Sequence, residues 1–262
     1  MKDSQRKVIE QIVNTALSRA EFHWEHGGYK IEEASRAGVE STNNNDTINM
    51  SKSSFPGYPI ITEYETIISE FVAFVADMRD STQHLMQAIS TKKAKVSQLQ
   101  RVFYETSALL PAIAKTIEFH KGKVTEYLGD GVLGFFKVEE CNRKDAMYSS
   151  SKAAKDVLEE TCPIVNNILH SKYNLPSLEI GIGLAMSKAI VSLTGLPDNP
   201  HPKAFGECVF RATKLSVGKN IICVDERMRK HWPSSPNGKV SFKETNLTVG
   251  NNIKGYIMEY KG

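Results

Sequence analysis

The sequence lacks the features that mark membrane-spanning, disulfide-stabilised and polynucleotide-binding proteins. In its 262 residues there is no apolar run long enough to cross a bilayer, and no apolar segment typical of a signal peptide near the start. The four cysteines show no spacing typical of a metal site, and the formal net charge is only +3. We therefore expect a cytoplasmic protein with free thiols that binds neither a membrane nor nucleic acid.

Changes in composition divide the chain into three parts. Apolar residues recur at helical spacing in residues 3–25, which predicts a helix that either packs on the main domain or contacts a second copy. Residues 33–58 are rich in Ser, Asn and Pro and have no apolar period, which indicates a linker. The resulting division is an N-terminal helix at 1–32, a polar linker at 33–62 and one domain at 63–262.

The main domain alternates predicted strands and helices in the order βαββαβ, followed by αβ and αββ. This order fits an α+β fold with a ferredoxin-like core and helices on one face of the sheet. Among the expected elements are a helix at 144–170 that Pro163 bends or divides, separate strands at 178–184 and 189–194, a Pro-rich loop at 196–203, and a helix at 206–217.

Asp77 stands at the end of the clearest strand pattern. The preceding run from Phe71 to Ala76 has no polar alternation, as in a strand buried on both faces. A carboxylate placed there is costly unless a cation compensates it, although an acid that caps a helix or lies in a loop is the plain alternative. The polar turn 78–82 follows, and its backbone amides could face an anion.

Asp130 lies in a second informative segment. Gly129-Asp130-Gly131 separates two β-rich stretches and predicts a hairpin turn. An isolated Asp-Gly pair is most simply a turn. A hairpin beside the central strand, however, can bring both acids to one sheet edge, where two carboxylates can hold a divalent metal against a triphosphate.

The pattern Phe-x-x-Asp-Met-x-x-Ser-Thr, which ends at Thr82, followed by Gly-Asp-Gly, resembles the class III nucleotidyl cyclases over residues 63–261. Weaker matches are the segment 180–183, the helix from Gly206 and the segment 253–255. The resemblance implies the cyclase fold and conversion of a nucleoside triphosphate to a 3′,5′-cyclic nucleotide. It also implies a homodimer in which each active site takes its metal-binding acids from one chain and its base-reading groups from the other.

The resemblance assigns roles to further residues. It implies two Mn²⁺ or Mg²⁺ ions per site, held by Asp77, Asp130 and the carbonyl of Met78. Arg79 and Lys254 are either phosphate contacts or solvated surface charges. The phosphate-binding residues that the resemblance and the turn chemistry suggest are Arg79, Asp80, Ser81, Thr82 and Lys254.

Two positions of the 206–217 helix depart from the family pattern. The family commonly has an Asn and, four residues later, an Arg, where this chain has Phe210 and Lys214. Lys214 can neutralise the α-phosphate as a point charge but cannot form a bidentate contact, and Arg211 could replace it if the helix is rotated. Phe210 cannot hydrogen-bond and could pack on the ribose or base. Lys214 and Arg211 are therefore the candidate catalytic residues.

The base-reading positions match neither purine pattern of the family. They hold Glu126 and Lys203, where adenylate cyclases usually have Lys and Asp and guanylate cyclases Glu and Cys. The pair either forms a salt bridge across a cleft or reads a pyrimidine, with UTP slightly favoured over CTP. With Phe210 these are the candidate base-binding residues. The pair is most similar to the bacterial uridylate and cytidylate cyclases of anti-phage signalling, which implies a separate cyclic-nucleotide effector.

Three other functions remain open at this level. The protein could be a purine cyclase, or a degenerate cyclase that binds nucleotide and signals without turnover, which Phe210 and Lys214 favour. A diguanylate cyclase or polymerase palm shares paired acids on a similar fold. A diguanylate cyclase would need a Gly-Gly-(Asp/Glu)-Glu-Phe hairpin, which the segment 128–132 lacks. A polymerase would need a strongly basic face, and the small net charge argues against one.

Overall fold

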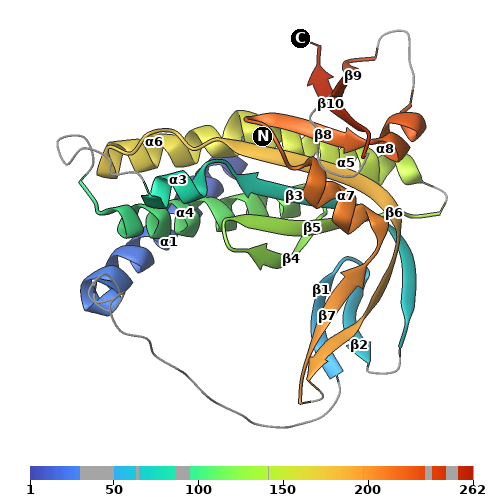
Figure 1. The fold of residues 1–262 in the computed structure, drawn as a ribbon, viewed down its shortest axis with the longest axis horizontal. Coiled ribbons are helices and arrows are strands. Elements are labelled where there is room, and N and C mark those ends of the chain that lie inside the picture. The colour runs from blue at the N-terminus through green and yellow to red at the C-terminus, as the bar shows by residue number, and fades with distance from the viewer. Residues whose placement is uncertain are drawn as a thin grey trace.

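The computed structural model describes residues 1–29, 50–62, 65–86, 95–140, 142–196, 198–233, 238–245 and 253–261. They form a mixed α+β fold around an eight-stranded sheet (Figure 1). Its strands are β3 Ile67–Met78, β4 Lys123–Leu128, β5 Gly131–Lys137, β6 Ile180–Leu196, β7 Asn199–Phe205, β8 Ile221–Asp225, β9 Val240–Thr245 and β10 Gly255–Tyr260. The strand order is β4-β5-β3-β6-β8-β10-β9, with β7 paired to β6.

The predicted βαββαβ core is confirmed. Strand β3 lies between β5 and β6 and is antiparallel to both, and β4 pairs with β5 at the edge. Helix α4 (Gln98–Phe119) links β3 to β4, and helices α5 (Arg143–Asp156) and α6 (Cys162–Tyr173) link β5 to β6. A π-helical turn, Val157–Thr161, separates α5 from α6 just before Pro163, so the predicted helix is divided close to this proline.

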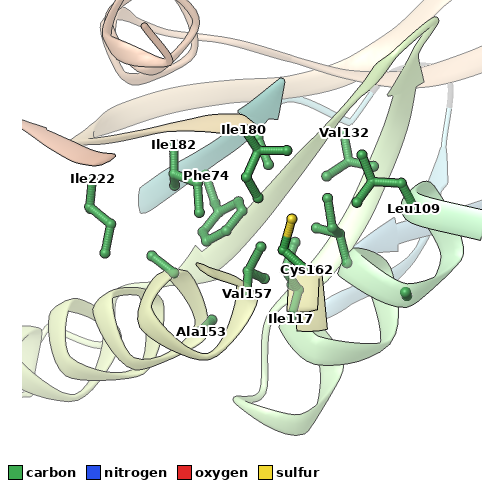
Figure 2. Close-up of a cluster of buried hydrophobic side chains, with 14 of the residues drawn as sticks. Phe74, Leu109, Ile117, Val132, Ala153, Val157, Cys162, Ile180, Ile182 and Ile222 are labelled. Atoms are coloured by element: carbon green, nitrogen blue, oxygen red, sulfur yellow. The ribbon is translucent and has the colours of Figure 1, made fainter. Parts of the chain in front are cut away.

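Strand β3 is buried on both faces, as its unbroken apolar run predicts. Val72, Phe74 and Ala76 point into the core beneath the helices, whereas Phe71, Ala73 and Val75 belong to a second cluster on the opposite face. Figure 2 shows Phe74 among side chains contributed by neighbouring strands and by α4, α5 and α6. A strand enclosed in this way is a rigid base for any group placed at its end.

Helix α1 (Asp3–His23) packs on the domain and shares its main core. Ile9, Val13 and Leu17 are fully buried there, at helical spacing. The face of α1 that carries these residues therefore packs on the main domain, which is one of the two alternatives that the sequence left open. None of the described helices is both long and apolar enough to span a bilayer.

Residues 50–62 belong to the segment whose polar composition predicts a linker. They instead form an antiparallel hairpin of β1 (Met50–Phe55) and β2 (Tyr58–Thr62). Its side chains Phe55 and Ile61 are buried in the second cluster, and the Phe55 ring lies 5.1 Å from that of Phe135. Two buried side chains in a short segment are too few to produce a periodic signal. The rest of the predicted linker, residues 33–49, lies outside the described residues.

The predicted strands at 178–184 and 189–194 are one continuous strand, and the predicted loop at 196–203 is mostly strand β7. The polar Ser187 between them does not interrupt the strand, because its hydroxyl stays inside the fold and accepts a hydrogen bond from the Cys208 amide at 2.9 Å. Strand β7 tolerates Pro200 and Pro202 because it pairs with β6 alone. In Figure 1 this β6–β7 extension runs beside β1 and β2.

Helix α7 (Glu207–Leu215) lies directly on β6 because two strand residues have no side chain. A Cβ at Gly183 would lie 2.0 Å from the Ala212 carbonyl oxygen, and one at Gly181 would lie 2.7 Å from that of Ser216. The segment 180–183, a weak match in the sequence, thus has a physical reason: its glycines let a helix touch the sheet.

We predict that Gly183→Ala destabilises the fold by roughly 1–3 kcal/mol or more, because the added methyl group forces α7 away from the sheet. Gly134→Ala is the matched control, since its Cβ would meet its nearest neighbour only at 3.1 Å. Urea denaturation measures both variants. Equal stability losses would contradict the direct packing of α7 on β6.

Candidate functional site

The two acids that the sequence singled out lie side by side. Asp77, at the end of β3, pairs in register with Gly131 of β5, which follows Asp130 directly. The Asp130 carbonyl accepts a hydrogen bond of 3.2 Å from the Met78 amide. Asp130 lies in the hairpin turn, where Gly129 has a φ of +68°, a conformation that favours glycine. The turn therefore fixes Asp130 next to the end of the central strand.

Gly131 allows this close approach. A Cβ at this position would lie 2.6 Å from the Ala76 carbonyl oxygen and 3.3 Å from the Asp77 Oδ1. Any side chain there would push the hairpin away from β3 or move the Asp77 carboxylate. The Gly-Asp-Gly sequence is thus explained by a positive φ on one side of the acid and by lack of space on the other.

Arg79 supplies a positive charge to this pair of acids. Its guanidinium forms an ion pair with the Asp77 carboxylate and is attracted by Asp130. Burial lowers the pKa of the Arg79 guanidinium, and its Nε is buried with no hydrogen-bond partner. The solvated-charge alternative for Arg79 does not describe this arrangement, and the phosphate contact stays a prediction. The side chain is an internal counter-ion to the two acids.

The turn after β3 is held by charges for which the sequence contains no local signal. Asp80 has a φ of +60°, and its carboxylate lies 2.6 Å from Nζ of Lys219, which also contacts Glu179 at 2.7 Å. This pairing lowers the pKa of Asp80. The Arg79 amide donates to the Glu179 carbonyl at 2.8 Å and is therefore not available to a phosphate. Ser81 and Thr82 open the short helix α3 (Ser81–Met86).

Helix α3 is attached to the core by a buried acid. Glu105 of α4 is fully buried and pairs with Arg101 at 2.7 Å and with His84 of α3 at 3.0 Å. A buried carboxylate needs such partners, and here they tie the turn to the helical layer. The sequence contains no signal for this network, because Glu105 sits at an ordinary helix position.

The arrangement fits divalent metal ions. Asp77 and Asp130 present two carboxylates at one edge, and the cation Arg79 is already drawn to them. In the described part of the chain, no group of three or more His, Cys, Asp or Glu side chains could hold a metal. Two carboxylates suffice where a triphosphate supplies the remaining oxygen ligands, as is usual for Mg²⁺.

Glu126 and Lys203 meet as the salt-bridge alternative predicts. Their Oε2 and Nζ atoms lie 3.4 Å apart, one on β4 and the other on β7. A β-bulge between Val124 and Glu126 changes the register of β4 at this point. Both residues line a cavity of about 450 Å³ whose lining does not include Asp77 or Asp130.

The remaining predicted residues lie on two other elements. Phe210 and Lys214 are both exposed on α7, as their spacing of four predicts, while Cys208, Ala212 and Leu215 face the sheet. Arg211, on the same helix, pairs with Glu207 at 3.5 Å.

Lys254 is exposed just before β10, whose Gly255 pairs with Asp225 at the end of β8. Asp77 pairs with Gly181, which in turn pairs with Ile221 at the start of β8. Lys254 and Asp77 therefore lie toward opposite ends of the same sheet. One chain does not bring the acids, the base-reading pair and this lysine together.

The fold is that of class III nucleotidyl cyclase catalytic domains. The adenylyl cyclase CyaB from P. aeruginosa superposes with a TM-score of 0.58 at 13% identity, covering 76% of this chain and 96% of its own. The guanylyl cyclase Cya2 gives a TM-score of 0.56 at 16% identity, with 75% and 94% covered. The guanylate cyclase domain of RhGC from Catenaria anguillulae, solved with GTP, gives 0.54 at 16% identity, with 76% and 100% covered.

No family model and no curated protein matches the sequence. At identities of 13–16% the structural likeness establishes the fold. The activity must therefore be argued from the residues of the site itself.

We predict that Arg79→Gln increases the affinity for Mn²⁺ by about tenfold, or ~1.4 kcal/mol, because the guanidinium no longer competes for the carboxylates. Titration followed by electron paramagnetic resonance, without nucleotide, measures free and bound Mn²⁺ directly. Arg143→Gln is the control, since Arg143 pairs with Glu70 away from the site. Unchanged or weaker binding by Arg79→Gln would show that Arg79 does not occupy the cation position.

Proposed function

We propose that this protein is a metal-dependent nucleotidyl cyclase that converts a nucleoside triphosphate to a 3′,5′-cyclic nucleotide and pyrophosphate. The observation that carries this proposal is the pair Asp77 and Asp130, held together at the end of a rigid central strand on a cyclase fold. A protein that only bound nucleotide would have little need for both acids in this geometry.

The reaction needs positioning and charge neutralisation more than a protein nucleophile. The ribose 3′-oxygen attacks the α-phosphorus, the bond from that phosphorus to the oxygen bridging to the β-phosphate breaks, pyrophosphate leaves with that bond's electron pair, and the 3′-hydroxyl proton passes to solvent water. Mn²⁺ or Mg²⁺, held by Asp77, Asp130 and the Met78 carbonyl, would lower the pKa of the hydroxyl and neutralise the β- and γ-phosphates when bound.

The chain's own groups supply the rest. The backbone amides of Asp80 to Thr82, at the start of α3, would face the phosphates. Arg79, which pairs with Asp77 in this structure, would give up that contact to a dication and would then pair with a phosphate oxygen. Lys214 neutralises the α-phosphate as charge develops.

The active unit in this proposal is a homodimer with two composite sites. Its support is the separation of the parts within one chain: the acids lie outside the Glu126–Lys203 cavity, and Lys254 lies toward the other end of the sheet. Two chains related by a twofold axis can place the acids of one against the cavity, Lys214 and Lys254 of the other. Phe210, exposed beside Lys214, would then pack on the ribose or base.

The proposed substrate is a pyrimidine nucleotide, with UTP favoured over CTP. Its support is that Glu126 and Lys203 match neither purine pattern and form an ion pair in a cavity. The proposed role is synthesis of a second messenger in anti-phage defence, read by a separate effector. That role rests on the resemblance of these positions to the bacterial pyrimidine cyclases.

A nucleotide-binding regulator without turnover is the second candidate. The ion pair of Arg79 with Asp77 favours it, since a permanent internal cation would keep metal ions away from the acids. The two candidates differ in whether Arg79 can be displaced, which product formation reveals.

We predict that the pure protein with Mn²⁺ forms a 3′,5′-cyclic pyrimidine nucleotide from one of the four ribonucleoside triphosphates, identified by mass spectrometry. Asp77→Asn and Asp130→Asn should each lower turnover by more than about a hundredfold, because each removes a charge that holds the dications. The exposed Glu139→Gln, outside the site, is the control.

Near-normal turnover by either folded Asn variant would refute the two-acid site. A cyclic purine nucleotide as the main product would leave the cyclase activity standing and overturn the pyrimidine assignment. No product from any triphosphate, with bound nucleotide detected, would favour the regulator.

We also predict complementation between two inactive variants, Asp77→Asn and Lys214→Ala. In a mixed dimer both defects fall in one site and the other site is intact, so mixing should restore up to about half of the activity per mixed dimer. The measurement is product formation after subunit exchange, with mixed dimers quantified by native mass spectrometry. Mixed dimers that stay inactive would exclude shared sites.

A further inference from the structure

The cavity that holds Glu126 and Lys203 has a third wall, which the sequence did not indicate. Strand β1 contributes Lys52, Ser54 and Phe55 to its lining. The other walls are β4, with Thr125 and Glu126, and β7, with residues 201–203. The segment that sequence composition assigned to a linker therefore forms part of the cavity.

The β1–β2 hairpin is held against the sheet by aromatic packing. The Phe55 side chain is only 3% exposed and contacts the rings of Phe71 and Phe135. The Tyr58 ring packs edge-on against Phe71 and carries the Lys137 ammonium 5.0 Å above it. The backbone that presents Lys52 and Ser54 is thus fixed in place, as a specificity wall must be.

The charged side chains among the described residues of the cavity lining are two lysines and one glutamate. Lys52 and Lys203 come from different walls and carry ammonium groups that only donate, whereas Glu126 accepts. Lys203 reaches Glu126 at 3.4 Å, which leaves protons on its ammonium for a ligand. His201, Ser54 and Thr125 can donate or accept. Such a set complements a ligand edge with carbonyl oxygens around one N–H group.

We infer that this cavity reads a base that presents a carbonyl beside an N–H, as uracil does, and that Lys52 is a further specificity-determining residue. The inference rests on the proposed function. Lys52 and Lys203 would donate to the two uracil carbonyls and Glu126 would accept the ring N–H between them. Cytosine and adenine present an amino group beside an unprotonated ring nitrogen. The amino group would face a lysine donor to donor, and the ring nitrogen would face Glu126 acceptor to acceptor. Guanine shares the carbonyl and N–H edge with uracil.

The test is direct binding of the four 3′-deoxyribonucleoside triphosphates, which lack the attacking hydroxyl and cannot be cyclised. Isothermal titration calorimetry with the full chain and Mg²⁺ gives the affinity ratio of 3′-deoxy-UTP to 3′-deoxy-CTP. We expect wild type to prefer the uridine analogue, and Lys52→Met to reduce the ratio by roughly tenfold, as the loss of one base-specific contact does. Because the two analogues carry the same phosphates, the ratio cancels any general loss of positive charge.

Lys243→Met is the matched control, since Lys243 is exposed on β9, outside the cavity lining. Ser54→Ala tests the same wall without changing a charge, and a smaller reduction of the ratio is expected. An unchanged ratio in Lys52→Met, or a preference of wild type for the cytidine or adenosine analogue, would overturn the inference.

Different results would overturn the pocket inference and the proposed cyclase function. If the uridine analogue is preferred and the ratio depends on Lys52, but no triphosphate yields a cyclic product, the pocket inference stands and the cyclase proposal falls. A preference for the guanosine analogue would support the reading of the carbonyl and N–H edge while overturning the pyrimidine assignment. Absence of binding by all four analogues would overturn both.

Discussion

The mutual repulsion of two carboxylates, Asp77 and Asp130, is the constraint on which the rest of the structure depends. Two acids at the edge of a buried sheet need a cation near both to offset their repulsion, and a backbone that holds them together against it. The antiparallel pairing of β3 with β5 and the hydrogen bond from Met78 to Asp130 supply the second condition. Arg79 supplies the first in this structure, and divalent ions supply it in the function we propose.

Rigidity at this edge follows from burial on both faces of β3. The apolar side chains from Phe71 to Ala76 are withdrawn from water, which contributes roughly 1.5–3 kcal/mol for a large residue such as Phe74. The helical layer covers one face, and α7 with the β1–β2 hairpin covers the other. Glycines at 181 and 183 let α7 reach the sheet, so the helix that carries Phe210 and Lys214 has a fixed position relative to the acids.

The charges around the site form two separate groups. One contains the acids and Arg79, with Lys219 tied to Asp80 and Glu179 beside it. The other contains Glu126 and Lys203 in the cavity walled by β1. A nucleotide needs both groups at once, with its phosphates at the first and its base at the second. Within one chain they do not share a cavity, and this division is the physical basis for proposing a dimer.

The sequence by itself determined the core fold and the two acids, because both depend on local signals. An unbroken apolar run predicts a doubly buried strand, and an acid at its end stands out against that background. Neighbours in the chain also predicted the Gly-Asp-Gly turn and the shared helix face of Phe210 and Lys214. A stated resemblance singled out Glu126 and Lys203, with a salt bridge between them as one alternative.

Only the tertiary structure decided where charges from distant segments meet. The contact of Arg79 with Asp77, the tie of Lys219 to Asp80 and Glu179, and the burial of Glu105 against Arg101 and His84 depend on packing between elements, which has no local signal. The β1–β2 hairpin was missed for a related reason. Residues 50–62 are too polar to predict strands alone, and they become a hairpin because Phe55 and Ile61 find an apolar surface on the sheet.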